Sequence, residues 1–196
     1  MGSPELDAAY WSGRYQQQDT GWDAGSITTP LKEYIDQLQN RELKILIPGA
    51  GNAHEAEYLF NAGFKNVFIC DLAQEPLDNF LKRCPGFDPD HLLLRDFFDL
   101  PAGYDLILEQ TFFCALNPSL RPEYFKKMEE ILNPGGRLVG LLFNDALNSN
   151  KPPFGGSKEE YLGYLPSSFS IKTFEPAYNS IQPRQGRELF MNLQRC

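Results

Sequence analysis

The sequence predicts an α/β fold around a mostly parallel seven-stranded sheet, and three observations support this prediction. Short apolar runs alternate with helical stretches through most of the chain, which is typical of parallel strands joined by crossover helices. A glycine-containing turn directly follows the first apolar run. Near the C-terminus, two strand-like runs follow one another with no helical stretch between them, which predicts a terminal antiparallel pair.

The expected strands are short apolar runs of the length that buried strands commonly have. The fifth run is entered through Pro134-Gly135-Gly136, whose residues favour a turn. The seven expected strands are residues 43–47, 66–70, 91–94, 104–108, 137–143, 169–174 and 188–193.

Helical periodicity appears before and between these runs. Residues 30–38 place Leu31, Tyr34, Ile35 and Leu38 on one face. Helices are also expected at residues 55–61, ended by Gly63, and at residues 122–132. The resulting order, β-α-β-α-β-β-α-β followed by two strands, is Rossmann-like, and mixed sheets are common among doubly wound folds.

Length and composition favour one globular domain spanning residues 1–196, because 196 residues can form a self-supporting core. Hydrophobic residues make up 42% of the chain and charged residues 22%, which is a globular rather than a disordered composition. No internal repeat or interdomain linker is evident. The polar, Pro- and Gly-rich segment at residues 148–156 is embedded in the fold, and we interpret it as an active-site loop.

The charge balance argues against some classes of partner. A net charge of −8 repels phosphate backbones and anionic lipid headgroups, so neither nucleic acid nor a membrane is expected as a partner. No apolar run approaches the roughly 20 residues that span a bilayer. The first residues also lack a signal-peptide pattern. We therefore expect a cytoplasmic protein.

The cysteines show no metal-binding spacing. They form no Cys-x-x-Cys pair and no cluster with His54 or His91, so we expect reduced thiols and no metal site. The four cysteines are Cys70, Cys84, Cys114 and Cys196.

The turn after the first strand predicts a nucleotide-like ligand. Gly49 and Gly51 would let the backbone approach a ligand at a helix N-terminus, although an ordinary tight turn could also use both glycines. His54 stands where a dinucleotide fingerprint has its third glycine, which argues against NAD. Asp71 ends the second strand about 20 residues after the turn, where a carboxylate can accept hydrogen bonds from ribose hydroxyls. S-adenosylmethionine has this ribose and no pyrophosphate.

The end of the third strand offers groups for an adenine ring. Asp96 provides a carboxylate for the adenine amino group, and Phe97 or Phe98 provides an aromatic surface. If this segment is extended, the two phenylalanines point in opposite directions, so one can face the cofactor. A place in the core is the alternative for either ring.

The sequence resembles the thiopurine S-methyltransferase superfamily, including its plant halide/thiol methyltransferase branch, over nearly the whole chain. No single physical requirement would produce all the shared motifs. They are Tyr10-Trp11, Arg14-Tyr15, Thr20-Gly21-Trp22-Asp23, Pro48-Gly49-Ala50-Gly51, Glu109, Thr111-Phe112-Phe113-Cys114-Ala115-Leu116, Arg121-Pro122-Glu123-Tyr124, Pro152-Pro153-Phe154, Ser180-Ile181, Arg184, Gly186 and Glu188.

This resemblance implies a class I methyltransferase fold, with S-adenosylmethionine as cofactor and a helical cap over about residues 1–40. It places Glu109 and Gln110 at the end of the fourth strand, where such sheets bind ligands. The cofactor-binding residues expected in total are Trp11, Trp22, Gly49, Gly51, Asp71, Leu72, Asp96, Phe97 and Glu109. The candidate substrate-contacting residues are Phe113, Arg121, Phe154 and Arg184.

The expected activity is methyl transfer to a small soft nucleophile, such as a thiol, a thiopurine-like compound or a halide. A thiolate is partly present near neutral pH, so such a reaction needs no strong general base. Aromatic pocket walls, expected from Trp11, Trp22, Phe112, Phe113 and Phe154, would promote transfer by orienting and desolvating the reactants. Cys114 fits a core position better than a covalent nucleophile, because direct displacement forms no enzyme intermediate.

Some alternatives stay open at this point. The plant halide/thiol enzymes have glycines where Ser149, Asn150 and Lys151 stand, so anion preference does not carry over. The competing classes are a small-molecule O- or N-methyltransferase, a non-catalytic protein that binds S-adenosylmethionine, and a nicotinamide dehydrogenase. We expect a monomer with a small-molecule substrate.

Overall fold

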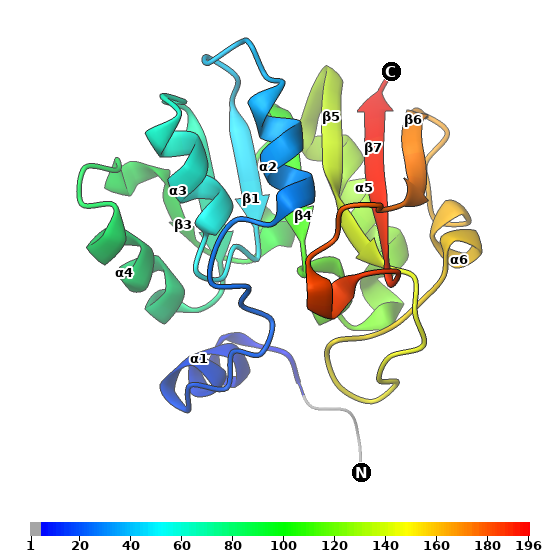
Figure 1. Ribbon diagram of the computed structural model, residues 1–196, viewed down its shortest axis with the longest axis horizontal. Helices are drawn as coiled ribbons and strands as arrows, with labels where there is room; N and C mark the ends of the chain where they lie inside the picture. The colour runs from blue at the N-terminus through cyan, green and yellow to red at the C-terminus, as the bar shows by residue number, and fades with distance from the viewer. Residues whose placement is uncertain (1–4) are drawn as a thin grey trace.

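The computed structural model describes residues 5–196 and contains one seven-stranded sheet in the order β3-β2-β1-β4-β5-β7-β6 (Figure 1). This arrangement confirms the predicted fold class. The strands are β1 (Ile45–Pro48), β2 (Val67–Asp71), β3 (Leu92–Leu94), β4 (Tyr104–Gln110), β5 (Leu132–Phe143), β6 (Phe169–Pro176) and β7 (Glu188–Arg195).

The first five strands run parallel, and β7 runs antiparallel to both of its neighbours. The last two strands pair as expected, but β7 inserts between β5 and β6. Its two-sided register pairs Leu193 with Leu138 of β5 and with Ile171 of β6. The final strand is therefore central in this half of the sheet, and β6 forms the edge.

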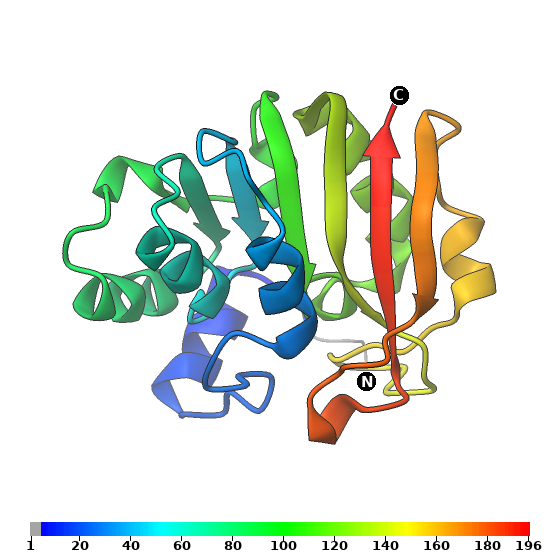
Figure 2. The same cartoon turned by 45° about the horizontal axis from the view of Figure 1, so that its top comes forward.

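The sheet has helices on both faces (Figure 2). The three helices with expected bounds are present with ends shifted by at most two residues. The helix α4 takes the place that the predicted order gives to a helix between the second and third strands, α1 belongs to the expected cap, and α6 was not predicted. The helices are α1 (Ala8–Gln16), α2 (Thr29–Asp36), α3 (His54–Asn61), α4 (Gln74–Arg83), α5 (Arg121–Ile131) and α6 (Lys158–Leu162). Short 3₁₀ turns are η1 (Pro89–His91), η2 (Phe97–Asp99), η3 (Phe113–Ala115), η4 (Pro118–Leu120) and η5 (Gln182–Arg184).

Alternation along the strands divides the core into two layers, because successive side chains point to opposite faces. Ile45 and Ile47 pack in the layer that contains Leu31 of α2 and Leu59 of α3. Leu46 packs in the other layer, with α5. Both faces of the central strands are therefore buried by core side chains, and only the carboxyl ends of these strands are available to form a site.

The start of β5 differs from the expectation. Pairing with β4 begins at Leu132 and resumes at Arg137 after a register shift, so Pro134-Gly135-Gly136 forms a bulge within the strand rather than a turn before it. Gly135 adopts a φ of +79°, a conformation that glycine tolerates without strain.

The N-terminal cap lies beyond the carboxyl ends of the strands and carries no fully buried residue on α1. Two hydrogen bonds hold α1 against α4: Ser12 Oγ and Gln16 Nε2 donate to Glu75 at 2.7 and 2.8 Å. In residues 5–196, no helix is both long enough and apolar enough to cross a bilayer.

Candidate active site

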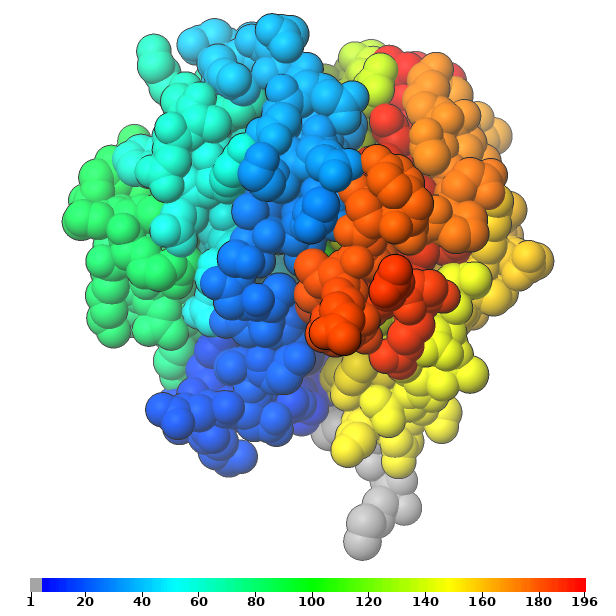
Figure 3. Space-filling model, viewed as in Figure 1, coloured from blue at the N-terminus to red at the C-terminus, as the bar shows by residue number. Residues whose placement is uncertain are grey.

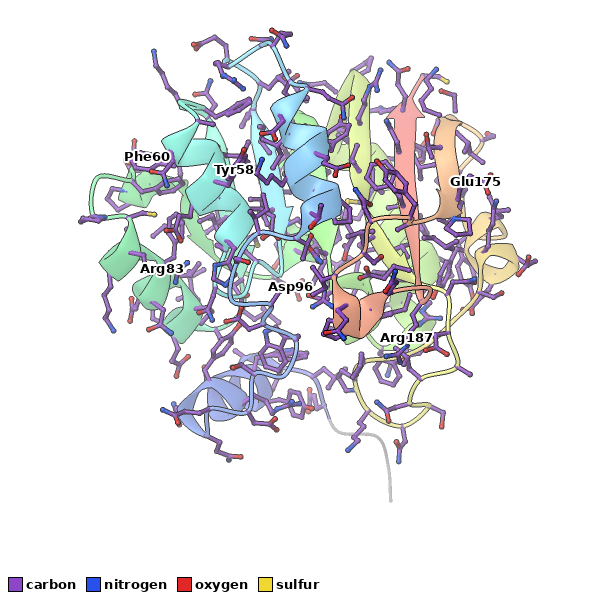
Figure 4. The ribbon with its side chains drawn as sticks, in the orientation of Figure 1. Tyr58, Phe60, Arg83, Asp96, Glu175 and Arg187 are labelled. Atoms are coloured by element: carbon purple, nitrogen blue, oxygen red, sulfur yellow. The ribbon has the colours of Figure 1, made fainter. Side chains whose placement is uncertain are left out.

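A cavity of about 810 Å³ lies between the carboxyl ends of the parallel strands, α1 and the C-terminal loops. This edge is where open α/β sheets bind their ligands. In Figure 4, Asp96 and Arg187, which both line the cavity, lie at the lower edge of the sheet, with Arg187 toward β7. Within the described chain, no group of His, Cys, Asp or Glu is arranged to hold a metal ion.

The turn after β1 requires its two glycines. Gly49 and Gly51 both have φ of +54°, in the left-handed region that other residues rarely adopt. A Cβ atom on Gly49 would lie 2.2 Å from Cδ2 of Phe112. A Cβ atom on Gly51 would lie 3.3 Å from the Tyr15 hydroxyl. The Phe112 ring therefore excludes a side chain at Gly49, and the positive φ together with the tight contact to Tyr15 disfavours one at Gly51.

Asp71 lies at the end of β2 and faces the cavity. Its Oδ2 accepts from Gly51 N at 3.1 Å, and its Oδ1 accepts from Ala73 N at 2.9 Å. Burial raises the pKa of Asp71 to about 6, although these backbone hydrogen bonds oppose the shift. Each oxygen keeps a lone pair for a further donor, and the pair is suited to a ribose diol.

The next wall is formed by Leu72, which follows β2, and by the segment after β3, which contributes Asp96. The segment is a 3₁₀ turn rather than an extended one, because Asp96 Oδ1 caps it by accepting from Phe98 N at 2.9 Å. Phe97 is only 3% exposed and contacts Phe112 with ring centroids 5.2 Å apart. Phe97 both lines the cavity and belongs to the core. A ring that faces the cofactor and a ring in the core, the two positions predicted as alternatives, are therefore compatible.

Aromatic rings of the cap close the cofactor side. Trp22 packs edge-to-face against Trp11 and Tyr15, with centroids 5.6 Å away in each case. Arg14 lies over the Trp22 ring at 5.0 Å. Tyr15 was not among the expected site residues, but it lies one helical turn after Trp11 and so shares its face of α1. That spacing was the available signal.

Glu109 does not line the cavity. It is 0% exposed and accepts hydrogen bonds from Phe112 N at 2.9 Å, Phe113 N at 3.0 Å and the Tyr124 hydroxyl at 2.7 Å. Burial raises its pKa to about 7. Glu109 therefore shapes the loop after β4 from behind, and Thr111, at φ +61°, and Phe112 face the cavity in its place.

A polar network joins the cap to the C-terminal loops. Arg184 Nη2 donates to the backbone oxygen of Trp22 at 2.6 Å. Its Nη1 donates to the side-chain oxygen of Gln110 at 2.6 Å, in the amide orientation that also lets Gln110 donate to Thr28 Oγ1 and Glu55 Oε1. Figure 3 shows the two segments in contact at the surface, the N-terminal one in blue and residues near 180 in orange and red.

Of the four candidate substrate-contacting residues, only Arg184 lines the cavity. Phe113 and Phe154 are 1% and 3% exposed and pack away from it. Arg121 is 2% exposed and pairs with Glu160 at 2.6 Å. We use the name acceptor end for the part of the cavity formed by the segment after β4, the end of β5, the loop at residues 148–156 and the segment before β7. It is lined by Cys114, Ala115, Leu116, Asn117, Leu120, Phe143, Pro152, Pro153, Pro183, Arg184 and Arg187.

Most of the acceptor end was not predicted by residue. Cys114, which we had interpreted as core, is 6% exposed yet reaches the cavity, and burial raises its pKa to about 12, so its thiol is neutral. Pro152 and Pro153 belong to the segment that was interpreted as an active-site loop. No pattern in the sequence indicates Phe143 or Arg187, which reach the site only through the path of β5 and β7.

These residues fit S-adenosylmethionine. The left-handed glycine turn, the half-satisfied carboxylate of Asp71 and the aromatic walls suit a methionyl chain, a ribose and an adenine respectively. His54 Nε2 is 2.8 Å from Asp23 Oδ1, so the place of a third glycine is used to tie the cap rather than to receive a pyrophosphate.

The fold and the site define a class I S-adenosylmethionine-dependent methyltransferase. A solved structure of 1,6-didemethyltoxoflavin-N1-methyltransferase from Burkholderia thailandensis has a TM-score of 0.78 and 16% identity, over 96% of this chain and 86% of that one. A TehB-like methyltransferase from Corynebacterium glutamicum has a TM-score of 0.71 and 17% identity, over 96% and 100% of the two chains. At these identities, the likeness concerns the fold.

The chain belongs to the thiopurine S-methyltransferase family, whose model matches residues 6–193. A probable thiol methyltransferase 2 from Arabidopsis thaliana is 29% identical over 190 residues, covering 94% of this chain and 84% of the relative. A thiopurine S-methyltransferase from Vibrio campbellii is 33% identical over 172 residues, covering 79% of each chain. The predicted family and cofactor are confirmed.

Proposed function

We propose that this enzyme transfers the methyl group of S-adenosylmethionine to the sulfur of a small thiol that reaches the site as a thiolate. When bound, the cofactor supplies an electrophilic methyl group on a sulfonium. The observation that carries the proposal is that the described residues lining the acceptor end include no histidine and no carboxylate that could act as a general base. The names of the relatives, a thiol and a thiopurine S-methyltransferase, support a sulfur acceptor.

The cavity's acidic groups are mostly engaged. In residues 5–196, its lining contains no histidine, and its carboxylates belong to Glu5, Asp7, Asp71 and Asp96. Asp7, Asp71 and Asp96 all accept hydrogen bonds from backbone N–H groups, and Glu5 is exposed at the start of the described chain. An alcohol or amine acceptor would need a positioned base, whereas a thiol is partly ionised near neutral pH.

The chain's own contribution is orientation and desolvation. Most residues of the acceptor end are apolar, which favours a desolvated nucleophile, and the aromatic cap covers the opposite side. Well-oriented reactants can gain on the order of 7–11 kcal/mol relative to separate molecules. Arg184 and Arg187 also line the acceptor end, but each is paired with a carboxylate, Arg184 with Glu188 at 3.6 Å and Arg187 with Asp145, so their positive charges are partly neutralised.

An acceptor screen tests the proposal. The purified protein is given S-adenosylmethionine and matched acceptors, thiophenol, phenol and aniline, and S-adenosylhomocysteine formation is measured. We expect turnover with thiophenol and none above background with the other two. Turnover with phenol or aniline in preference to thiophenol would contradict the proposal and favour an O- or N-methyltransferase.

Asp71→Asn tests the cofactor site separately from the acceptor. The amide places an N–H group against backbone N–H donors and removes the charge, and hydrogen bonds to charged groups contribute about 1.5–3 kcal/mol. We expect affinity for S-adenosylhomocysteine, measured by calorimetry, to fall by about 10- to 100-fold. Asp78→Asn, an exposed change on α4, is the matched control and should leave the affinity unchanged. Equal affinities of the Asp71 variant and the wild type would refute this assignment.

A further inference from the structure

We propose that Arg121 is a positioning residue that sets the shape of the acceptor end without touching the acceptor. This inference rests on the proposed function for its kinetic consequence. It concerns the segment at residues 144–157, which we call the proline loop and which carries Pro152 and Pro153 into the cavity.

Arg121 is the first residue of α5 and lies behind the acceptor end rather than in it. Its Nη2 donates to the backbone oxygen of Gly155 at 2.8 Å, which anchors the proline loop. Its Nη1 pairs with Glu160 of α6 at 2.6 Å. One planar guanidinium group therefore engages the loop and the helix that follows it at the same time, which is the geometry in which arginine differs from lysine.

The same side chain also supports the opposite wall. The Arg121 guanidinium lies 5.0 Å from the ring centroid of Phe113 and 5.6 Å from that of Tyr161. Phe113 begins the turn whose next residue, Cys114, lines the cavity. Arg121 thus joins two segments that form two walls of the acceptor end, and cation–π contacts of this kind strengthen when they are desolvated.

The two walls are also joined directly. Phe154 N of the proline loop donates to the backbone oxygen of Cys114 at 2.7 Å. Gly155 packs closely against the start of the proline loop, because a Cβ atom on Gly155 would lie 2.2 Å from the backbone oxygen of Asp145. The two ends of the loop therefore have little room to move closer together. A displacement of the Gly155 carbonyl must therefore move Pro153 and Phe154 relative to Cys114.

A contact between Arg121 and an anionic acceptor is the competing role. The structure opposes it, because the side chain is 2% exposed and its charge is already paired with Glu160. A direct contact would act through charge, and so Arg121→Lys would preserve part of it. A positioning role would be lost in Arg121→Lys, because the ammonium group cannot hold both partners and stack in the same place.

The experiment compares Arg121→Lys with the wild type on thiophenol and 4-mercaptobenzoate, two aromatic thiols that differ by one carboxylate. We expect KM to rise by a similar factor, about tenfold, for both acceptors. This factor corresponds to the loss of one hydrogen bond, the one from Arg121 to the Gly155 oxygen. The kcat and the affinity for S-adenosylhomocysteine should stay within about twofold, because the cofactor side is untouched. Amide hydrogen exchange at Phe154 should become faster.

Gly155→Ala provides an independent variant, because it displaces the proline loop while leaving Arg121 in place. It should reproduce the KM increase and the faster exchange at Phe154, also if Arg121→Lys proves too unstable to purify. Arg41→Lys is the matched control, since Arg41 also donates to a backbone oxygen and lies over a phenylalanine ring, but remote from the cavity. It should change none of these quantities.

A KM increase confined to 4-mercaptobenzoate would overturn the proposal and establish a charge contact. Unchanged KM and unchanged exchange at Phe154 would overturn it as well. If the wild type methylates neither thiol, the proposed function fails, and the exchange measurement on Arg121→Lys still decides whether Arg121 holds the loop.

Discussion

Glu109 illustrates how a single buried group shapes this site from outside it. Its carboxyl group holds two consecutive backbone N–H groups and the Tyr124 hydroxyl, which sets the left-handed Thr111 and the ring of Phe112 at the cavity. Gly49 in turn leaves the space that Phe112 fills. The sequence placed Glu109 at the right edge of the sheet but could not show whether it faces the ligand or the core.

The raised pKa of Glu109 predicts a pH dependence of stability. The folded state favours the neutral carboxyl, whose pKa rises from 4.5 to about 7, so it binds more protons than the unfolded state in this range. The stabilisation that the neutral Glu109 carboxyl gives the folded state is fully present below pH 4.5 and is lost as the pH rises through about 7. Glu109→Gln removes this titration. Between pH 4.5 and 7, the unfolding free energy of the variant should therefore rise relative to that of the wild type by about 3 kcal/mol. Denaturant unfolding of both proteins at pH 4.5 and 8 measures this change. The same difference between variant and wild type at both pH values would contradict the prediction.

Gly49→Ala should damage the site at the same place. The new Cβ atom would lie 2.2 Å from the Phe112 ring at a φ of +54°, so the ring or the turn must move. We expect a loss of stability of about 1–3 kcal/mol and weaker binding of S-adenosylhomocysteine. Gly63→Ala, at φ +85° with no atom within 4 Å, is the control for conformational strain alone. Equal losses in the two variants would show that the contact with Phe112 is unimportant.

At the scale of elements, α1 covers the site through few contacts. It has no fully buried residue, and its two hydrogen bonds to α4 converge on Glu75. The loop after it is held more firmly, because Asp23 pairs with His54 of α3 and Arg184 binds the Trp22 carbonyl. The helix is therefore the part of the cap that can open most easily, since local opening follows from sparse burial.

Glu75→Ala should loosen the cap specifically. Both hydrogen bonds from α1 are lost, so we expect faster amide exchange in residues 8–16 and an affinity for S-adenosylhomocysteine that is weaker by about three- to tenfold. Asp78→Ala on the same helix removes only a hydrogen bond from Gln74 and serves as the control. If cap exchange is the same in both variants, Glu75 does not hold α1.

At the scale of the whole molecule, the absence of a histidine or carboxylate among the described residues of the acceptor end makes a kinetic prediction. The value of kcat/KM should rise with the thiolate fraction, and the midpoint of the pH profile should move with the pKa of the thiol when the acceptor is changed. Profiles for thiophenol and an alkyl thiol measure this directly. A midpoint that stays between 6 and 7 for both acceptors would instead implicate Asp71 or Glu109, whose pKa values are about 6 and 7.

The sequence by itself determined the class of fold and the turn and strand end that line the cavity. Strand alternation, Gly49, Gly51 and Asp71 carry this information locally, because a turn and the residue that ends a strand are fixed by their neighbours in the chain. The tertiary structure decided most of the acceptor end, of which the sequence indicated only Arg184 and the proline loop. Phe143 and Arg187 meet there because β7 inserts beside β5. Arg121 and Glu109 turn inward because nearby loops offer unpaired backbone groups to them, and pairing across distant segments leaves no local pattern in the sequence.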